Sequence, residues 1–133
     1  MNLTSRPITE EDIKGKLSDW WKDWGFDVAP IGFLPDCGIM VASDGIDVCA
    51  AFMYTTNSNV AWISWIISDK NYRIKPNRKN ALTFLIDDIS RAAKEFGFEY
   101  CYINFDNAHL IPICEELGFV KGSKTQEMIK KWD

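Results

Sequence analysis

Five of the fifteen basic residues in this chain of 133 residues fall within one stretch of ten, from Lys70 to Lys79. The stretch contains no acidic residue, so the rest of the chain has a net charge of −9, against −4 for the whole. A helix-patterned run follows it, and a helix N-terminus already favours an anion by up to about 1 kcal/mol. This arrangement predicts phosphate capture by side-chain charge. Charge runs of this kind also occur as solvated loops, which is the competing interpretation.

The cysteines and the one histidine do not indicate a metal site. No C-x-x-C pair occurs, and His109 is the only histidine. We therefore expect no zinc centre and reduced, mostly buried thiols. A mechanism that pairs a nucleophile with a histidine base would have to use His109, for which a surface position is the better interpretation. The four cysteines are Cys37, Cys49, Cys101 and Cys114.

The overall composition suits one globular domain over residues 1–133. The chain is 47% hydrophobic, 14% aromatic and 26% charged, which excludes disorder. Its net negative charge argues against broad nucleic-acid binding, which depends on neutralising many phosphates. No run approaches the roughly 18 apolar residues of a membrane span. Because the N-terminus also lacks the apolar core of a secretory signal, we expect a cytoplasmic protein without membrane contact.

The first third of the chain predicts a strand and a helix. Leu3 to Ile8 is patterned as a short strand, and Thr9 with Asp12 three residues later forms a variant of the capping box. Apolar residues then recur at helical spacing as far as Trp24, and Gly25 is a natural stop. The result is an amphipathic helix with a heavy aromatic stripe.

Three antiparallel strands are predicted next. Gly38 to Ala42 and Ile46 to Thr55 are joined by a turn containing Asp44 and Gly45, and Val60 to Ile67 follows a second turn. The sequence positions of Trp62 and Trp65 differ by an odd number of residues, so we expect the two side chains on opposite faces of the sheet. One of them would then line the substrate side, where a protonated amine could rest against it.

The second half predicts helix, strand, helix and strand. The segments are Asn80 to Phe96, Tyr100 to Phe105, Ala108 to Leu117 with Pro112 moving its start towards Leu110, and a closing or edge strand from Thr125 to Trp132. The whole order predicts an α+β (mixed α/β) fold. Its central sheet would be mostly antiparallel, with helices on both faces.

The segment Asn107 to Phe119, which ends in Leu117-Gly118-Phe119, resembles the last helix of the GNAT superfamily of N-acetyltransferases. With the order of elements and the basic stretch, the resemblance covers roughly Ile46 to Lys121. The resemblance implies that the chain is a compact, divergent member of this superfamily. The chain also has a weaker similarity to GNAT-like proteins of tailed phages. Acetyl-coenzyme A would lie where the strand of Val60 to Ser68 parts from the strand of Tyr100 to Phe105.

The resemblance also implies which residues hold the cofactor. Backbone groups of Ile67 and Ser68 would meet the acetyl and pantetheine arm, and Asn107 would bind the pantetheine arm as well as cap the helix. The family's pyrophosphate loop contains glycines that this chain lacks, so asparagines and cations would replace part of a backbone cradle. The replacing residues are Arg73, Lys75, Asn77, Arg78, Lys79 and Asn80.

Cys114 occupies the position at which many family members keep a tyrosine as the general acid for the leaving thiolate. A thiol can supply such a proton, although a cysteine on an apolar helix face more often serves packing. The strand from Val60 to Ile67 carries no acidic residue to act as a base. A water chain, Asp69 or Tyr54 would have to remove the proton from the attacking amine.

Together these features predict an acyl-coenzyme A-dependent N-acetyltransferase in which a primary amine attacks the thioester directly. Acetyl-coenzyme A would be the co-substrate, and no metal would be needed. The acceptor would be a small-molecule or protein amine, and a homodimer is left open. The alternative is a catalytically inactive GNAT-fold binding protein, which the missing glycines and the missing tyrosine favour.

Overall fold

The computed structural model of the chain describes residues 2–30, 32–74 and 76–133. Lys75, one of the predicted cofactor residues, lies outside the described residues. The described part forms one five-stranded sheet in the order β1-β2-β3-β4-β5. Its strands are β1 (Leu3–Pro7), β2 (Gly38–Ser43), β3 (Ile46–Tyr54), β4 (Val60–Ser68) and β5 (Tyr100–Ile103).

Neighbouring strands are antiparallel from β1 to β4, whereas β4 and β5 are parallel. The mostly antiparallel sheet confirms the predicted fold class. The β2–β3 hairpin turns at Asp44 and Gly45, which have φ angles of 52° and 83°. Both angles fall in the left-handed region that a tight hairpin of this kind requires. The predicted turn therefore lies at the expected residues.

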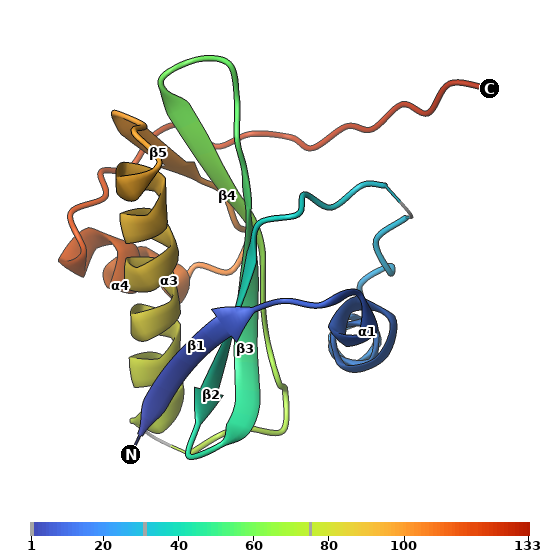
Figure 1. Ribbon diagram of the computed structural model, residues 1–133, viewed down its shortest axis with the longest axis vertical. Coiled ribbons are helices and arrows are strands. Elements are labelled where there is room, and N and C mark those ends of the chain that lie inside the picture. The colour runs from blue at the N-terminus through green and yellow to red at the C-terminus, as the bar shows by residue number, and fades with distance from the viewer. Residues whose placement is uncertain (1, 31, 75) are drawn as a thin grey trace.

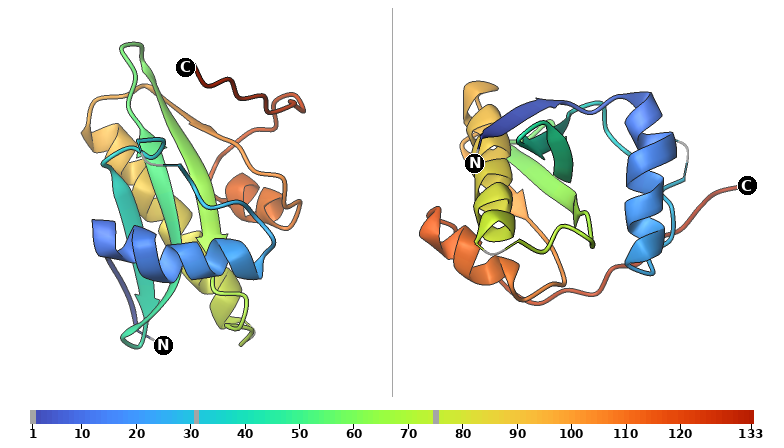
Figure 2. Two further views of the ribbon diagram at one scale, coloured as in Figure 1. Left: turned by 90° about the vertical axis from the view of Figure 1, so that its right-hand side faces the viewer. Right: turned by 90° about the horizontal axis from the view of Figure 1, so that it is seen from below.

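Helices cover both faces of the sheet (Figures 1 and 2). On one face lie α3 (Asn77–Glu95) and α4 (Leu110–Glu116). On the other face lies a continuous helical segment made of α1 (Glu10–Asp12), a π-helical stretch η1 (Ile13–Leu17) and α2 (Ser18–Asp23). This arrangement of layers follows the sequence-based prediction.

The predicted capping box at the start of α1 is present. The Thr9 hydroxyl oxygen accepts from the Asp12 amide at 3.2 Å, and the Asp12 carboxylate accepts from the Thr9 amide at 2.8 Å. By contrast, α3 begins three residues before the predicted start at Asn80. Pro76 occupies its N-cap position, so Asn77, Arg78, Lys79 and Asn80, which were predicted to form part of a loop, belong to the first turn of a helix.

Three apolar clusters fix the layers. On α3, Ala81, Leu85 and Ile89 recur every four residues and pack on the sheet together with Val41 and other strand residues. On the opposite face, the aromatic stripe of α2 packs on the sheet in a second cluster that includes Leu17, Trp20, Trp21, Met40, Phe52 and Ile67. A third cluster joins α3 to α4.

A bulge in β4 overturns the prediction for its tryptophans. Between the pairs Phe52–Ser64 and Ala50–Ile67, β3 supplies one residue while β4 supplies two, and Trp65 has a φ of 59°. The extra residue shifts the alternation of side chains. Trp62 pairs with Tyr54 across the strands, and the indole of Trp65 donates to the Tyr54 hydroxyl. Both tryptophans therefore lie on the face that α2 covers, rather than on opposite faces.

The predicted last strand, from Thr125 to Trp132, is not formed. Residues 119–133 have neither helix nor strand, and the end of the chain extends away from the sheet (Figure 1). Alternation of side chains was the only signal for this strand, and alternation does not supply a partner for the backbone. Met128 and Trp132 are exposed as a result. None of the described helices has the length and apolar character needed to cross a bilayer.

A candidate coenzyme cleft between two parting strands

The two parallel strands β4 and β5 separate partway along their length. They are paired from Val60 with Tyr100 to Ile63 with Ile103. The Asn104 amide still reaches the Ile63 carbonyl oxygen at 3.4 Å, but β4 then continues to Ser68 without β5 beside it. The second half of β4 therefore has a cleft on the side where β5 would otherwise lie.

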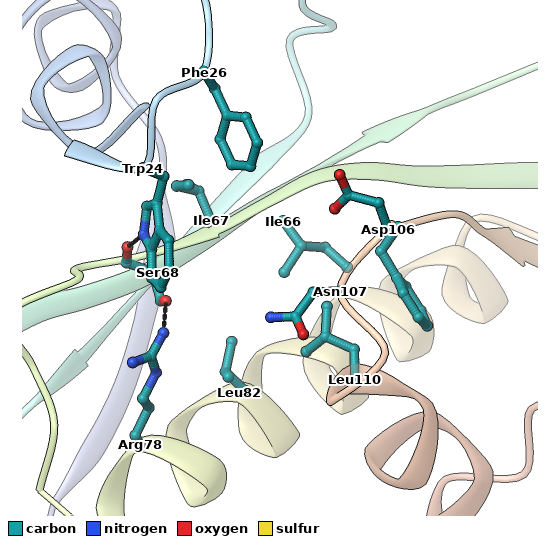
Figure 3. A pocket seen from close by; sticks show the side chains of 11 residues that line it. Trp24, Phe26, Ile66, Ile67, Ser68, Arg78, Leu82, Asp106, Asn107 and Leu110 are labelled. Atoms are coloured by element: carbon teal, nitrogen blue, oxygen red, sulfur yellow. Dashed lines mark hydrogen bonds between the residues drawn. The ribbon is translucent and has the colours of Figure 1, made fainter. Parts of the chain in front are cut away.

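A pocket of about 90 Å³ lies in this cleft (Figure 3). The second half of β4 forms one wall, and the loop between β5 and α4 forms the opposite wall. The first turns of α3 and the chain after α2 complete it. The lining residues are Trp24, Phe26, Ile66, Ile67, Ser68, Arg78, Leu82, Phe105, Asp106, Asn107 and Leu110.

Ser68 is the most connected polar residue of the pocket. The Arg78 guanidinium donates to its hydroxyl oxygen at 2.9 Å, and the Trp24 indole N–H donates to its main-chain oxygen at 2.7 Å. The Arg78 guanidinium carbon also lies 5.3 Å from the centre of the Trp24 ring, within the range of a cation–π contact. Trp24, Ser68 and Arg78 therefore form one polar and aromatic unit at the end of β4.

Asn107 faces the pocket from the opposite wall. Its side-chain oxygen accepts from the His109 amide at 3.0 Å, and its main-chain oxygen accepts from the Leu110 amide at 3.0 Å. These bonds fix the turn before α4, which begins at Leu110 as the position of Pro112 predicted. The amide nitrogen of Asn107 points towards the middle of the pocket (Figure 3), where it can donate to a carbonyl oxygen of a ligand.

Two backbone N–H groups in the first turn of α3 already have intramolecular acceptors. The Arg78 amide donates to the Ile74 carbonyl oxygen at 3.0 Å, and the Asn80 amide donates to the Pro76 carbonyl oxygen at 3.1 Å. These two donors are therefore not free to bind an anion at this helix end, which increases the weight of the side chains there. Arg78 is the cation of this turn that lines the pocket.

The predicted cofactor residues are only partly brought together. Ile67, Ser68, Arg78 and Asn107 line the pocket, whereas Arg73, Asn77, Lys79 and Asn80 do not. The Arg73 side chain donates to the Lys70 carbonyl oxygen at 2.9 Å, and Lys79 forms an exposed ion pair with Glu116 of α4 at 3.4 Å. Those two cations are therefore engaged outside the pocket.

Cys114, the predicted general acid, does not line this pocket. It packs among Ile86, Leu110 and Ile113 between α3 and α4, and it borders a separate hollow of about 770 Å³ between β5, α4 and residues 119–125. Burial raises the pKa of its thiol to about 11. A thiol with so high a pKa releases its proton less readily than an ordinary thiol, so this environment favours the packing role.

Neither residue considered as a base lines the pocket. The Tyr54 hydroxyl donates to the Phe33 carbonyl oxygen at 2.9 Å and accepts from the Trp65 indole at 3.0 Å, and burial raises its pKa. The Asp69 carboxylate accepts from the Asn71 amide at 2.9 Å. Both side chains therefore have structural partners.

Trp24, Phe26 and Asp106 are among the lining residues that were not predicted as site residues from the sequence. Trp24 was assigned to the helical stripe, and only the fold shows that it reaches the end of β4. Asp106 directly precedes Asn107 in the sequence, and this was the only feature of the sequence that could have indicated a place for Asp106 in the site. Within residues 2–30, 32–74 and 76–133, no group of three or more potential metal ligands is present.

Comparison with solved structures identifies the architecture. An acetyltransferase from Trypanosoma brucei is similar with a TM-score of 0.60 and 16% identity, over 97% of this chain and 100% of that chain. A ribosomal-protein-alanine N-acetyltransferase from Brucella melitensis is similar with a TM-score of 0.64 and 13% identity, over 98% of this chain and 100% of that chain. N-acetylglutamate synthase from Neisseria gonorrhoeae, solved with coenzyme A and N-acetyl-glutamate, is similar with a TM-score of 0.65 and 15% identity. The match covers 92% of this chain and 29% of that chain. No family model and no curated protein matches the sequence.

The parted strands and the flanking helices therefore define a GNAT-type fold, which confirms the resemblance found in the sequence. The similarity lies in the backbone and few residues are shared, so these structures show the fold alone.

Proposed function

We propose that this protein is an acyl-coenzyme A-dependent N-acetyltransferase that acetylates a primary amine. The observation that carries the proposal is the separation of β4 from β5 after Ile63, with a pocket in the gap. The coenzyme A complex of the Neisseria gonorrhoeae enzyme supports coenzyme binding in a fold of this class. The acceptor would be a small-molecule or protein amine.

In this proposal the pantetheine arm of acetyl-coenzyme A lies along the second half of β4. Asn107 donates its amide N–H to a carbonyl of that arm, and Arg78 supplies positive charge for the phosphates. Backbone N–H groups near Ile67 and Ser68 polarise the thioester carbonyl. For Arg78 to reach a phosphate, its hydrogen bond to Ser68 must be exchanged for one to the ligand.

The reaction needs no covalent enzyme intermediate. The neutral amine nitrogen attacks the thioester carbonyl carbon, the carbon–sulfur bond breaks, and coenzyme A leaves as a thiolate. One proton passes from the nitrogen to the thiolate, so the products are the amide and free coenzyme A. Holding amine and thioester in contact supplies much of the rate enhancement. Water delivers the proton in this scheme, because Cys114 does not line the pocket.

A catalytically inactive GNAT-fold binding protein is the second candidate, and two features of the pocket make it worth testing. The hydroxyl and main-chain oxygens of Ser68 are both already hydrogen bonded, and Trp24 stands against them. The pocket volume of about 90 Å³ is also well below the roughly 300 Å³ at which small-molecule sites begin. Acetyl-coenzyme A therefore requires Trp24 or Phe26 to move.

Calorimetric titration with acetyl-coenzyme A tests the binding step. We expect the wild-type protein to bind, and Arg78→Ala to weaken binding about tenfold or more because a charge-assisted contact is lost. Arg91→Ala is the matched control, since Arg91 lies on the same helix and pairs with Asp87 at the surface. Absence of binding in the wild type would remove the proposed coenzyme site.

Release of free coenzyme A then separates the two candidates. An enzyme releases thiol in proportion to the amine supplied, and the same preparation acetylates that amine, as mass spectrometry would detect. A protein that binds acetyl-coenzyme A but releases no thiol with any of a panel of amines would fit the inactive alternative.

A further inference from the structure

An aromatic patch lies on the sheet face opposite α3. Register places Tyr54 of β3 opposite Trp62 of β4, and Trp62 opposite Tyr102 of β5. Tyr100 lies two residues before Tyr102 and so shares its face. The rings of Tyr54 and Trp62 stack with centres 4.8 Å apart. We call these four residues the aromatic patch.

The patch is open to solvent. Trp62 is 37% exposed, Tyr102 50% and Tyr100 65%. Their neighbours in sequence on β4 and β5, by contrast, pack towards α3. Large aromatic side chains on a sheet face are normally covered, so this group is suited to meet a ligand.

The same strand connects the patch to the mouth of the proposed coenzyme cleft. The Trp62 indole donates to the side-chain oxygen of Asn104 at 2.5 Å, which holds Asn104 on the face of the patch. Two residues further on, the carboxylate of Asp106 stands at the mouth of the pocket, across from Phe26 (Figure 3). The step from Tyr102 to Asp106 is four residues, which sets an upper limit of about 13 Å on the distance between their Cα atoms.

Two carboxylates and the aromatic rings near this path favour a cation, although Lys121 and Lys124 border the hollow that Tyr102 and Asp106 also line. Aromatic faces attract ammonium groups through the quadrupole of the ring. Among the described residues, the recorded cation–ring contacts are on Trp24 and Trp132, and none is on the patch. Burial is the main cause of the raised pKa of Tyr54, and the carboxylate of Glu127 adds a small contribution, so a negative group lies in the neighbourhood of the patch. Asp106 supplies a second one at the other end.

We infer that the acceptor is an elongated diamine whose distal ammonium group rests on the aromatic patch while its reacting amine lies beside Asp106 at the cleft. This inference rests on the proposed function and specifies its substrate class. The two nitrogens of an extended chain of about eight methylenes are separated by less than this upper limit of about 13 Å. A single positive charge would occupy only one of the two ends.

Calorimetric binding of three simple amines tests the inference: diaminooctane, octylamine and diaminopropane. We expect diaminooctane to bind at least about fivefold more tightly than the other two. Octylamine lacks the second charge, and diaminopropane is too short to reach both ends. A ring contact worth about 1 kcal/mol corresponds to that factor. Equal affinity for diaminooctane and octylamine would overturn the inference.

Variants of the patch locate the distal group. Trp62→Leu and Tyr102→Leu should each weaken diaminooctane binding about fivefold and leave octylamine binding unchanged. Phe96→Leu is the control, because Phe96 is 61% exposed at the end of α3 and lies outside the patch. Two patch variants are used so that a folding defect in one does not decide the result. Unchanged binding in both would overturn the inference, as would a patch that is buried by self-association in solution.

Thiol release from acetyl-coenzyme A with the same amines distinguishes this inference from the proposed function. If octylamine and diaminooctane are acetylated with equal KM, the proposed function stands and the inference fails. If diaminooctane binds through the patch but no thiol is released with any amine, the cation site stands and the proposed enzyme activity fails.

Discussion

The Trp24 indole donates a hydrogen bond to the main-chain oxygen of Ser68 at 2.7 Å, across 44 positions of the sequence. The bond joins the chain at the end of α2 to the end of β4. Lys70 strengthens the same junction, since its ammonium group lies 5.4 Å from the centre of the Trp24 ring and donates to the Asp23 carbonyl oxygen at 3.2 Å. One wall of the pocket is therefore fixed by the helix on the far side of the sheet.

Trp24→Phe should lower the free energy of unfolding by about 1 kcal/mol, because the ring is largely kept while the hydrogen bond to Ser68 is lost. Urea titration followed by circular dichroism measures the change. Trp132→Phe is the control, since Trp132 is 76% exposed on the C-terminal segment. An equal effect of the two substitutions would show that the bond to Ser68 contributes nothing to stability.

Two glycines in different backbone conformations should respond in opposite ways to alanine. Gly45 has a φ of 83° in the hairpin turn, so Gly45→Ala should destabilise the protein by about 1 kcal/mol or more. Gly15 lies in the helical stretch with open space around an added Cβ, so Gly15→Ala should stabilise by about 0.5–1 kcal/mol. Thermal unfolding gives the melting temperatures of the two variants. Melting temperatures that both rise or both fall relative to the wild type would contradict this account.

Most of the architecture could be predicted from the sequence, because the periodic spacing of apolar residues and the turn residues indicate the individual elements. The stripe on α3, the β-patterned runs of β2 and β3 and the turn at Asp44 and Gly45 are local patterns, and each led to the observed element. The bulge at Trp65 could not be predicted in this way. An extra residue in a strand leaves no mark in the sequence, yet it reverses which face every later side chain occupies.

The site was less predictable than the fold because it depends on contacts between distant segments. Asn107 and Arg78 were identified through the resemblance, and both line the pocket. Trp24 was read as part of a helical stripe, which was correct locally but gave no indication of its bond to Ser68. Arg78 and Lys79 separate because they are adjacent on one helical turn, which sends Lys79 towards α4 and Arg78 into the cleft.

Cys114→Ala should leave the rate of acetyl transfer within about twofold of the wild type. The thiol lies outside the pocket, and burial holds its pKa at about 11. A loss of about a hundredfold or more would instead identify Cys114 as the general acid, since proton transfer by a positioned group contributes at least that much. Thiol release at saturating acetyl-coenzyme A measures the rate. The melting temperature of the same sample shows whether any loss comes from the packing of α4.

The contacts between Arg6 and two carboxylates predict how stability depends on pH. The Arg6 guanidinium binds Asp12 at 2.7 Å and Asp47 at 2.9 Å, and Lys16 also binds Asp47 at 2.8 Å. The hydrogen bond from Arg6 holds the pKa of Asp12 well below its usual range. Burial alone would raise the pKa of Asp47, but hydrogen bonds from Lys16 and Arg6 outweigh burial and lower it.

A carboxylate whose pKa is lower in the folded state stabilises the fold above the unfolded-state pKa of about 3.9, and that contribution is lost as the pH falls towards the folded-state pKa. The free energy of unfolding should therefore decline as the pH is lowered from about 5 to about 2. In Arg6→Gln the stability should be lower at neutral pH and the decline shallower, because Asp12 and Asp47 would titrate closer to their unfolded values. Arg91→Gln removes only an exposed pair with Asp87 and should keep the wild-type slope. Urea titrations across this pH range measure all three proteins, and parallel curves for the wild type and Arg6→Gln would contradict the assigned role of Arg6.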